Sequence, residues 1–293
     1  MYRIFVYLTE DKKMRYYLLD ALRGFALINM IAYHGIWDLV HIFGMDWKWY
    51  LSEGAYVWQQ GICWTFILLS GFCWAMGRKK WKRGMTVFGA GLAVTAATLL
   101  FMPQDRVIFG VLTLLGSCML LWIFLSRILE RIPAWLGLLG SFGLFIVTRG
   151  VNQGYLGFER WKILDLPRSW YRNLVTAFLG FPESDFYSAD YFPLLPWIFL
   201  FGTGYFFYRL SVKRGWLPDR TGAVPGGQDD RRTFSSLLVR VRIRPLEWAG
   251  RHSLILYLAH QPVIYGLLQL FFHRIWENDV ILITTFIIKR LIK

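Results

Sequence analysis

Long apolar runs separated by short polar stretches account for most of the chain. We interpret seven of them as membrane-spanning helices, because about 20 apolar residues cross a hydrocarbon core of about 30 Å. They lie at about 16–40, 54–77, 84–102, 107–125, 133–148, 190–208 and 245–272. A final apolar stretch, 280–288, is too short to cross alone, so residues 273–293 are expected to form a tail or a partial last helix. The pattern predicts an all-α, polytopic transmembrane bundle of about seven or eight spanning helices.

The polar stretches predict how the bundle is oriented. Five of the six residues in 78–83 are basic, and such a run marks the cytoplasmic side of a membrane protein. The N-terminal arm, 1–15, and a linker with several glycines and prolines, 209–244, are then cytoplasmic. The stretch 149–190 lies outside. It exceeds the usual length of a loop, so we expect it to be functional or to form a small subdomain.

Composition supports a membrane protein and argues against a nucleic-acid partner. Charged residues are 18% of the chain, whereas a soluble domain carries about 25%. The net charge of +14 comes from basic residues between the apolar runs, where an anionic inner leaflet is the natural partner. We expect a multi-pass protein of a bacterial plasma membrane in contact with lipid. Cys63, Cys73 and Cys118 lie within apolar runs and show no metal-binding spacing, so buried, inert thiols and no bound metal are expected.

The first spanning run carries a stripe of polar side chains. At 100° per residue, one face of this helix holds Asp20, Arg23, Met30, His34, Asp38 and His41. Arg23 and His34 are eleven residues apart, which places them about 16 Å apart along the axis. Ionisable residues inside a spanning helix usually face a polar cavity. With Asp38 one turn further on to orient its imidazole, His34 is a candidate general base.

Each of these residues also has a simpler structural interpretation. Arg23 would bind a phosphate or carboxylate, or would pair with Asp20. His34 and Asp38 would satisfy only one another near the interface, and His41 fits an interfacial position. In the last run, Ser253, Tyr257 and His260 share one helix face. His260 would bind substrate, or would be a partner at a helix kink for the backbone carbonyl that Pro262 frees.

Several motifs resemble those of a known enzyme family. The eleven-residue step from Arg23 to His34 resembles the Arg-x10-His signature of membrane-bound acyltransferases. The segments 19–24 (LDALRG), 68–72 (LLSGF), 190–197 (DYFPLLPW) and 253–262 (SLILYLAHQP) look like those of the DUF1624 group. That group is related to the catalytic domain of heparan-alpha-glucosaminide N-acetyltransferase. The resemblance covers about residues 16–272, which we treat as one transmembrane acyltransferase domain.

The resemblance implies transfer of an acyl group, commonly acetyl, from cytosolic acyl-CoA to an acceptor at the outer face. His34 matches the motif histidine that acts as the base, and Arg23 matches the motif arginine. Asp190 and His260 match recurrent motif positions. In heparan-alpha-glucosaminide N-acetyltransferase, a lysosomal enzyme, the reactive histidine belongs to the loop after the first helix. His34 lies within the helix instead, so here we expect direct transfer rather than a covalent acetyl-histidine.

The remaining site residues are placed by the scheme that this resemblance implies. The acceptor would be a sugar, a glycan or a lipid headgroup, held by Asp190, His260, Ser253, Tyr257 and Arg149. The CoA phosphates would be held at the inner mouth by Arg78, Lys79 and Arg251 in some combination. Acetyl-CoA is then the co-substrate. A homodimer is compatible with this scheme.

Two other classes of function are weighed against the enzyme. A proton-coupled transporter of small solutes would use Arg23, His34 and Asp38 as a transport path, and it predicts solute flux without acyl-CoA. Inverted repeats are common in such transporters, and none is visible in the sequence. A membrane scaffold would use the same stripe as a structural polar core. Thermal stabilisation by CoA favours the enzyme over both.

Overall fold

The structure is a computed structural model that describes residues 16–217 and 241–291, with side chains as far as residue 273. The expected N-terminal arm, 1–15, and most of the expected linker, 218–240, lie outside the described residues. Most of what is described is helical. The long helices are α1 (Tyr17–His41), α2 (Glu53–Met76), α3 (Lys80–Phe101), α4 (Val111–Leu129), α5 (Ala134–Val147), α7 (Leu194–Lys213) and α10 (Ser253–Leu291).

Four helical stretches in the described part of the chain are long and apolar enough to cross a membrane. They are Lys80–Phe101, Val111–Leu129, Ala134–Gln153 and Ser253–His273. Helices α1, α2 and α7 contain 25, 24 and 20 residues, which at 1.5 Å per residue also matches a bilayer core. By length and composition together, only the first four stretches qualify among the described residues. An integral membrane protein is therefore supported, and the count of seven or eight spans stays a prediction.

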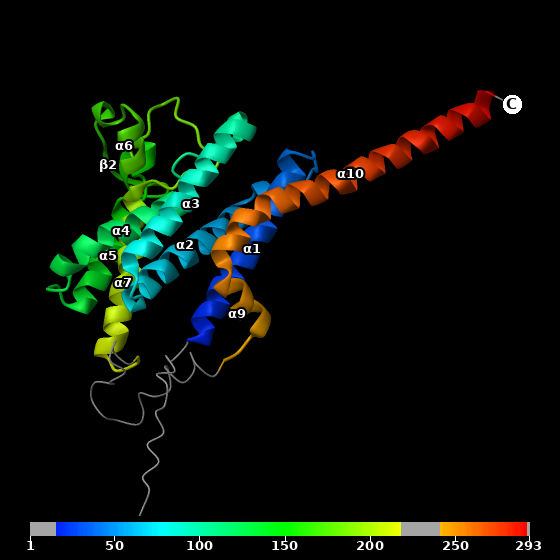
Figure 1. Ribbon diagram of the computed structural model, residues 1–293. Coiled ribbons are helices and arrows are strands. Elements are labelled where there is room, and N and C mark those ends of the chain that lie inside the picture. Colours follow the sequence, from blue (N-terminus) through cyan, green and yellow to red (C-terminus); the bar gives the residue numbers. More distant parts are fainter. Residues whose placement is uncertain (1–15, 218–240, 292–293) are drawn as a thin grey trace, which may run out of the picture.

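The last expected span, 245–272, is not one helix. A short helix, α9 (Arg244–Arg251), ends at His252, and α10 begins at Ser253. The separation has a packing cause: α9 lies tightly along α1, and α10 then leaves in a new direction (Figure 1). Pro262 sits inside α10 without ending it. The expected tail continues this helix to Leu291, so α10 extends well beyond the other helices (Figure 1).

The segment between α5 and α7 also departs from the all-α prediction. It contains a β-hairpin of β1 (Tyr155–Phe158) and β2 (Trp161–Asp165), paired antiparallel. Gly157 has a φ of +144°, and a Cβ there would collide with the carbonyl group of Trp161, so this bulged position favours glycine. The last helix of the segment is α6 (Leu174–Leu179), next to one end of the helical bundle (Figure 1). A stretch expected to be a functional loop or a small subdomain thus has secondary structure of its own.

The helices pack around two apolar clusters. The larger one joins four helices through buried side chains, one from each: Ile67 (α2), Leu114 (α4), Phe145 (α5) and Phe201 (α7). A smaller cluster joins α1, α2 and α9 through Leu27, Met30, Ile62 and Ala249. Helix α2 belongs to both clusters and contacts both α1 and α7. The space between the clusters is where the cavity described next is found.

Candidate active site

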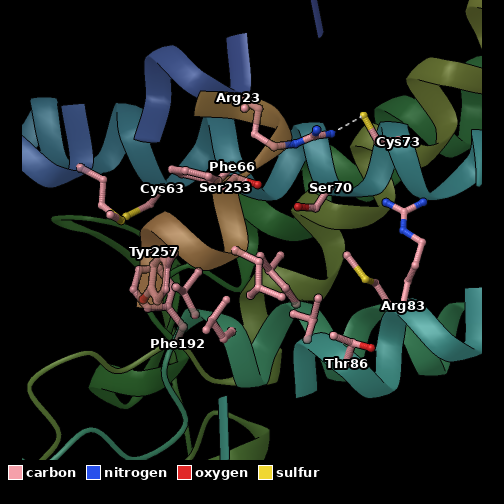
Figure 2. A pocket seen from close by; sticks show the side chains of 18 of the residues that line it. Arg23, Cys63, Phe66, Ser70, Cys73, Arg83, Thr86, Phe192, Ser253 and Tyr257 are labelled. Atoms are coloured by element: carbon pink, nitrogen blue, oxygen red, sulfur yellow. Dashed lines mark hydrogen bonds between the residues drawn. The ribbon is translucent and has the colours of Figure 1, made fainter. Parts of the chain in front are cut away.

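One cavity of about 600 Å³ lies between the two clusters and is lined by six helices and the segment before α7. Its lining residues are Arg23, Met30 and His34 from α1; Ile62, Cys63, Phe66, Ser70 and Cys73 from α2; Lys82, Arg83, Thr86 and Val87 from α3, with Lys79 just before it; Val111, Leu112, Leu115 and Met119 from α4; Asp190 and Phe192; Gly250 and Arg251 from α9; and Ser253, Leu254 and Tyr257 from α10. Figure 2 shows Cys73 and Arg83 at one end, and Cys63 and Tyr257 at the other.

Five cationic side chains gather at the first end. Arg23 comes from α1 and Arg251 from α9, while Lys79, Lys82 and Arg83 come from the start of α3. Like charges at this density repel one another unless an anion lies among them. This end therefore favours a multiply charged anion such as a phosphate group, which guanidinium groups bind well.

Two of these cations are held in place by neighbouring groups. The guanidinium of Arg23 donates to Cys73 Sγ at 3.1 Å and to Asp20 Oδ1 at 3.3 Å, so the predicted contact with Asp20 exists and still leaves Arg23 in the cavity wall. Arg251 lies beside Glu247, a fully buried carboxylate whose Oε2 is 3.8 Å from Arg251 Nη2. Glu247 had no distinguishing sequence motif and was not among the predicted site residues.

Residues of the basic run 78–83 were predicted to lie at the inner mouth of the cavity, but only some of them line it. Lys79 lines the cavity as expected, whereas Arg78 is exposed and is not among the lining residues. Lys82 and Arg83, which were not singled out, do line it. The signal was available in the spacing, because residues three and four apart share a helix face, so Lys79 faces the same way as Lys82 and Arg83.

His34 stands toward the other end of the cavity. It is eleven residues beyond Arg23 on α1, which is about three helical turns or 16 Å. Both side chains line the same cavity, with Met30 between them, so this part of the polar stripe of α1 faces an open space. The ring of His260, from α10, lies 5.1 Å from the His34 ring between centroids. His260 Nδ1 bonds the backbone oxygen of Tyr257, and the ring is not among the lining residues of the cavity.

The predicted pairing of His34 with Asp38 is wrong. Asp38 is fully buried, and its Oδ1 accepts a hydrogen bond of 2.7 Å from Gln261 Nε2 on α10. Its Oδ2 has no hydrogen-bond partner among the described residues. One helical turn allows an i, i+4 contact but does not compel it, and here the neighbouring helix supplies the partner. His41, at the end of the same face, is exposed and stacks on Trp37 at 4.8 Å.

Asp190 lies outside the long helices, in the segment before α7. Its Oδ2 accepts a hydrogen bond of 3.1 Å from the backbone N–H of Val111, at the start of α4, where a negative charge is favoured by the helix dipole. The hydroxyl of Tyr257 is its side-chain partner. Burial raises the pKa of Asp190 to about 6, because a charged carboxylate loses its hydration there. Asp190, Tyr257 and Ser253 all line the cavity, as the sequence scheme requires of acceptor-binding residues.

Arg149 is not among the residues that line the cavity. Its guanidinium donates to Gln60 Oε1 at 2.9 Å and to the Tyr56 hydroxyl at 3.3 Å, and it lies 4.9 Å from the centre of the Trp197 ring. Arg149 Nε is also 3.6 Å from Glu159, next to the β-hairpin. The expected substrate ligand therefore joins α2, α7 and the hairpin, which is a structural position.

The three cysteines lie in α2 and α4. All three cysteines are free, but Cys63 and Cys73 line the cavity rather than apolar packing alone. In the part of the chain that the structure describes, no group of three or more histidine, cysteine, aspartate or glutamate side chains gathers as a metal ion requires.

Comparison with known proteins places the chain in a family. The family model described as heparan-alpha-glucosaminide N-acetyltransferase, catalytic, matches residues 15–262. That range covers most of the chain and includes every residue that lines the cavity. The chain therefore belongs to this family of membrane acetyltransferases, as its motifs indicated. Comparison with curated proteins and with solved structures gives no match.

Proposed function

We propose that this member of the heparan-alpha-glucosaminide N-acetyltransferase family transfers an acetyl group from acetyl-CoA to an acceptor at the outer face of the membrane. The donor would bind with its phosphates among Arg23, Lys79, Lys82, Arg83 and Arg251. Its pantetheine arm would follow the cavity to His34. The family implies acetyl-CoA as the donor, and the rest of this scheme is our inference from the cavity.

The observation that carries the proposal is the arrangement of charge along one cavity. Cations line one end, and an imidazole, a carboxylate and a phenol lie toward the other. Acyl-CoA has the same order, with phosphates at one end and a reactive thioester at the other. The separation of Arg23 and His34, about 16 Å, suits the extended arm that joins the two. A path for a small solute would not need this collection of phosphate-binding groups.

His34 is proposed as the general base. The acceptor's amine or hydroxyl attacks the thioester carbonyl carbon while His34 removes its proton. The C–S bond then breaks, and the proton passes from His34 to the leaving thiolate, so that CoA leaves as the thiol. All atoms are accounted for without a covalent acyl-enzyme. Cys63 and Tyr257 lie at this end of the cavity (Figure 2), where the acyl group would stand.

A carbohydrate or a lipid headgroup is proposed as the acceptor. The matched family is named for a glucosaminide, a sugar that carries an amino group. In this chain, the segment between α5 and α7 presents exposed aromatic rings, among them Trp161, Trp170 and Tyr187. Flat aromatic surfaces with one polar edge suit recognition of sugars at a membrane surface. Asp190 and Ser253, in the cavity wall, would orient the acceptor's amine or hydroxyl.

Substitution of His34 tests the proposal directly. The purified protein in lipid nanodiscs is incubated with radiolabelled acetyl-CoA and a panel of amino sugars, neutral sugars and lipid headgroups. His34→Ala is expected to lower transfer by at least about 100-fold, the usual contribution of a general base. The matched control is His41→Ala, on the same helix but exposed and outside the cavity, and it should retain activity.

Binding is measured separately so that loss of activity is not confused with loss of fold. Both variants should keep the rise in melting temperature that CoA produces in the wild type, since His34 is far from the cationic end. Full activity of His34→Ala would remove His34 from the mechanism. Solute flux through the wild type without acyl-CoA, and no stabilisation by CoA, would favour the transporter instead.

A further inference from the structure

A second, much smaller void adjoins the His34 end of the cavity. Its volume is about 10 Å³, roughly the space of one water molecule. It lies in the contact between α3 and α4, where Gly91 and Gly110 form part of its wall. Leu112, Asp190 and Tyr257 line both spaces. These three side chains therefore form the partition between the cavity and the void.

Tyr257 is the largest part of this partition and is fixed in position. Its hydroxyl contacts the Asp190 carboxylate, which is in turn bound to the backbone of Val111. Its ring lies 5.3 Å from the ring of His260, and that ring lies 5.1 Å from His34. In Figure 2 the Tyr257 ring stands with Phe192 at the end of the cavity opposite Arg83.

The direction of the donor follows from the charges. If the CoA phosphates lie among the cations, the acyl group is the part farthest from them and closest to His34. Carbons beyond the carbonyl must then extend further in the same direction, toward Tyr257. An acetyl group adds only one methyl there, whereas a butyryl group adds two more methylenes and meets the ring.

We propose that Tyr257 limits the length of the acyl group that the cavity accepts. The inference rests on the proposed function, since it assumes that an acyl-CoA binds with its thioester beside His34. It adds the residue that selects acetyl over longer chains and the space, between α3 and α4, into which a longer chain would extend.

Shortening the side chain at this position should change the chain-length preference. Tyr257→Ala and Tyr257→Leu open the partition and join the void to the cavity. Each methylene that becomes buried is worth about fourfold in kcat/KM, so the two extra methylenes should raise the butyryl-to-acetyl ratio of kcat/KM by at least about tenfold. Tyr257→Phe keeps the ring and removes only the hydroxyl. Its ratio should stay near that of the wild type, whatever its overall rate.

The experiment measures kcat/KM for acetyl-, butyryl- and hexanoyl-CoA with the full chain in nanodiscs. The matched control is Tyr265→Ala, another tyrosine of α10 that is 41% exposed and outside the cavity; its chain-length ratio should be unchanged. If Tyr257→Ala does not fold, Tyr257→Leu carries the test, because it keeps an apolar side chain in the helix. Stabilisation by CoA reports the fold of each variant.

The possible results separate this inference from the proposed function. Acetyl transfer by the wild type, with a tenfold change in ratio in Tyr257→Leu but not in Tyr257→Phe, supports it. Acetyl transfer by the wild type with an unchanged ratio in the shortened variants overturns it and leaves the proposed function standing. If the wild type transfers no acetyl group from acetyl-CoA, the proposed function fails and this inference fails with it.

Discussion

The guanidinium of Arg23 is bound on one side by Asp20 and on the other by Cys73 Sγ, yet it still lines the cavity. Two carboxylates, Asp20 beside Arg23 and Glu247 beside Arg251, cannot neutralise the five cations at this end. The excess positive charge is carried by Lys79, Lys82 and Arg83, which project from the first turns of α3. Attraction for a polyanionic ligand is therefore shared among several residues, and each should contribute a measurable part.

Two arginines of the basic run provide a matched test of this idea. Arg83 lines the cavity and Arg78 does not, although they are five residues apart and have the same charge. Arg83→Ala should weaken CoA binding about tenfold or more, since a hydrogen bond to a charged group is worth about 1.5–3 kcal/mol. Arg78→Ala should change it much less. Isothermal titration with CoA in nanodiscs measures both, and equal losses would mean that only the total charge matters.

From the sequence it was easier to predict which residues of α1 face the cavity than to predict which side chains they contact. Helical periodicity placed Arg23 and His34 on one face of α1, because both lie on the same helix and the geometry of a helix is known. The partner of Asp38 comes instead from Gln261, more than 200 residues away, and depends on how α10 crosses α1. The way in which two helices cross cannot be read from local sequence. The predicted partner of Asp38 was therefore its neighbour along the same helix, His34, and that prediction was wrong.

At the scale of helices, the position of the basic end depends on how closely α9 approaches α1. A methyl group on Gly250 would overlap the backbone oxygen of Asp20, and one on Gly24 would overlap that of Leu246. The two backbones are therefore in contact, as small residues allow in membrane proteins. Arg251 follows Gly250 directly, so the same contact places its guanidinium at the cavity.

Gly250→Ala should force α9 away from α1. The added methyl meets backbone rather than a flexible side chain, and such overpacking costs about 1–3 kcal/mol of the free energy of unfolding. The variant should melt at a lower temperature and bind CoA more weakly, because Arg251 moves with α9. Gly266→Ala, in α10 with nothing within 4 Å of the added methyl, is the control and should be neutral or slightly stabilising. Thermal unfolding in detergent with and without CoA measures both effects.

Elements were predicted best where a helix is long and apolar. Helices α1 and α2 begin and end within a residue or two of the expected spans, since length and hydropathy are local properties. The break at His252 was missed because the packing of α9 on α1 fixes it, although the change from the polar residues of α9, Glu247 and Arg251, to the apolar run of α10 could have marked it. The hairpin β1–β2 was missed because its five-residue strand β2 is exposed throughout and has no buried face to give an alternating pattern.

At the scale of the whole molecule, the cavity exists because two groups of helices meet without filling the space between them. Helices α1, α9 and α10 form one group, and α3, α4, α5 and α7 form the other (Figure 1). Helix α2 contacts α1 on one side and α7 on the other. The sequence indicated a polar path from the composition of α1 alone. The opposite wall, which comes from α3 and α4, depends on long-range packing that one sequence does not determine.

The proposed chemistry also fixes how the molecule must sit in the membrane. Cytosolic acetyl-CoA can reach the cationic end only if that end faces the cytoplasm, with the β-hairpin on the other side. The run 78–83, at the connection between α2 and α3, has five basic residues in six positions, and such runs remain on the cytoplasmic side. The cationic ligand site and the basic run thus require the same orientation, one through the source of the ligand and the other through membrane insertion.

Single introduced cysteines test this orientation. Arg78→Cys lies in the basic run, and Trp161→Cys replaces an 83% exposed residue of β2. A membrane-impermeant maleimide should label Trp161→Cys in right-side-out vesicles and Arg78→Cys in inverted ones, with the unmodified chain giving the background from its own three thiols. The reverse pattern would place the cations outside, where no cytosolic donor reaches them. The cations along the cavity would still attract a polyanion. That polyanion would then have to come from the side of the membrane opposite the cytosol.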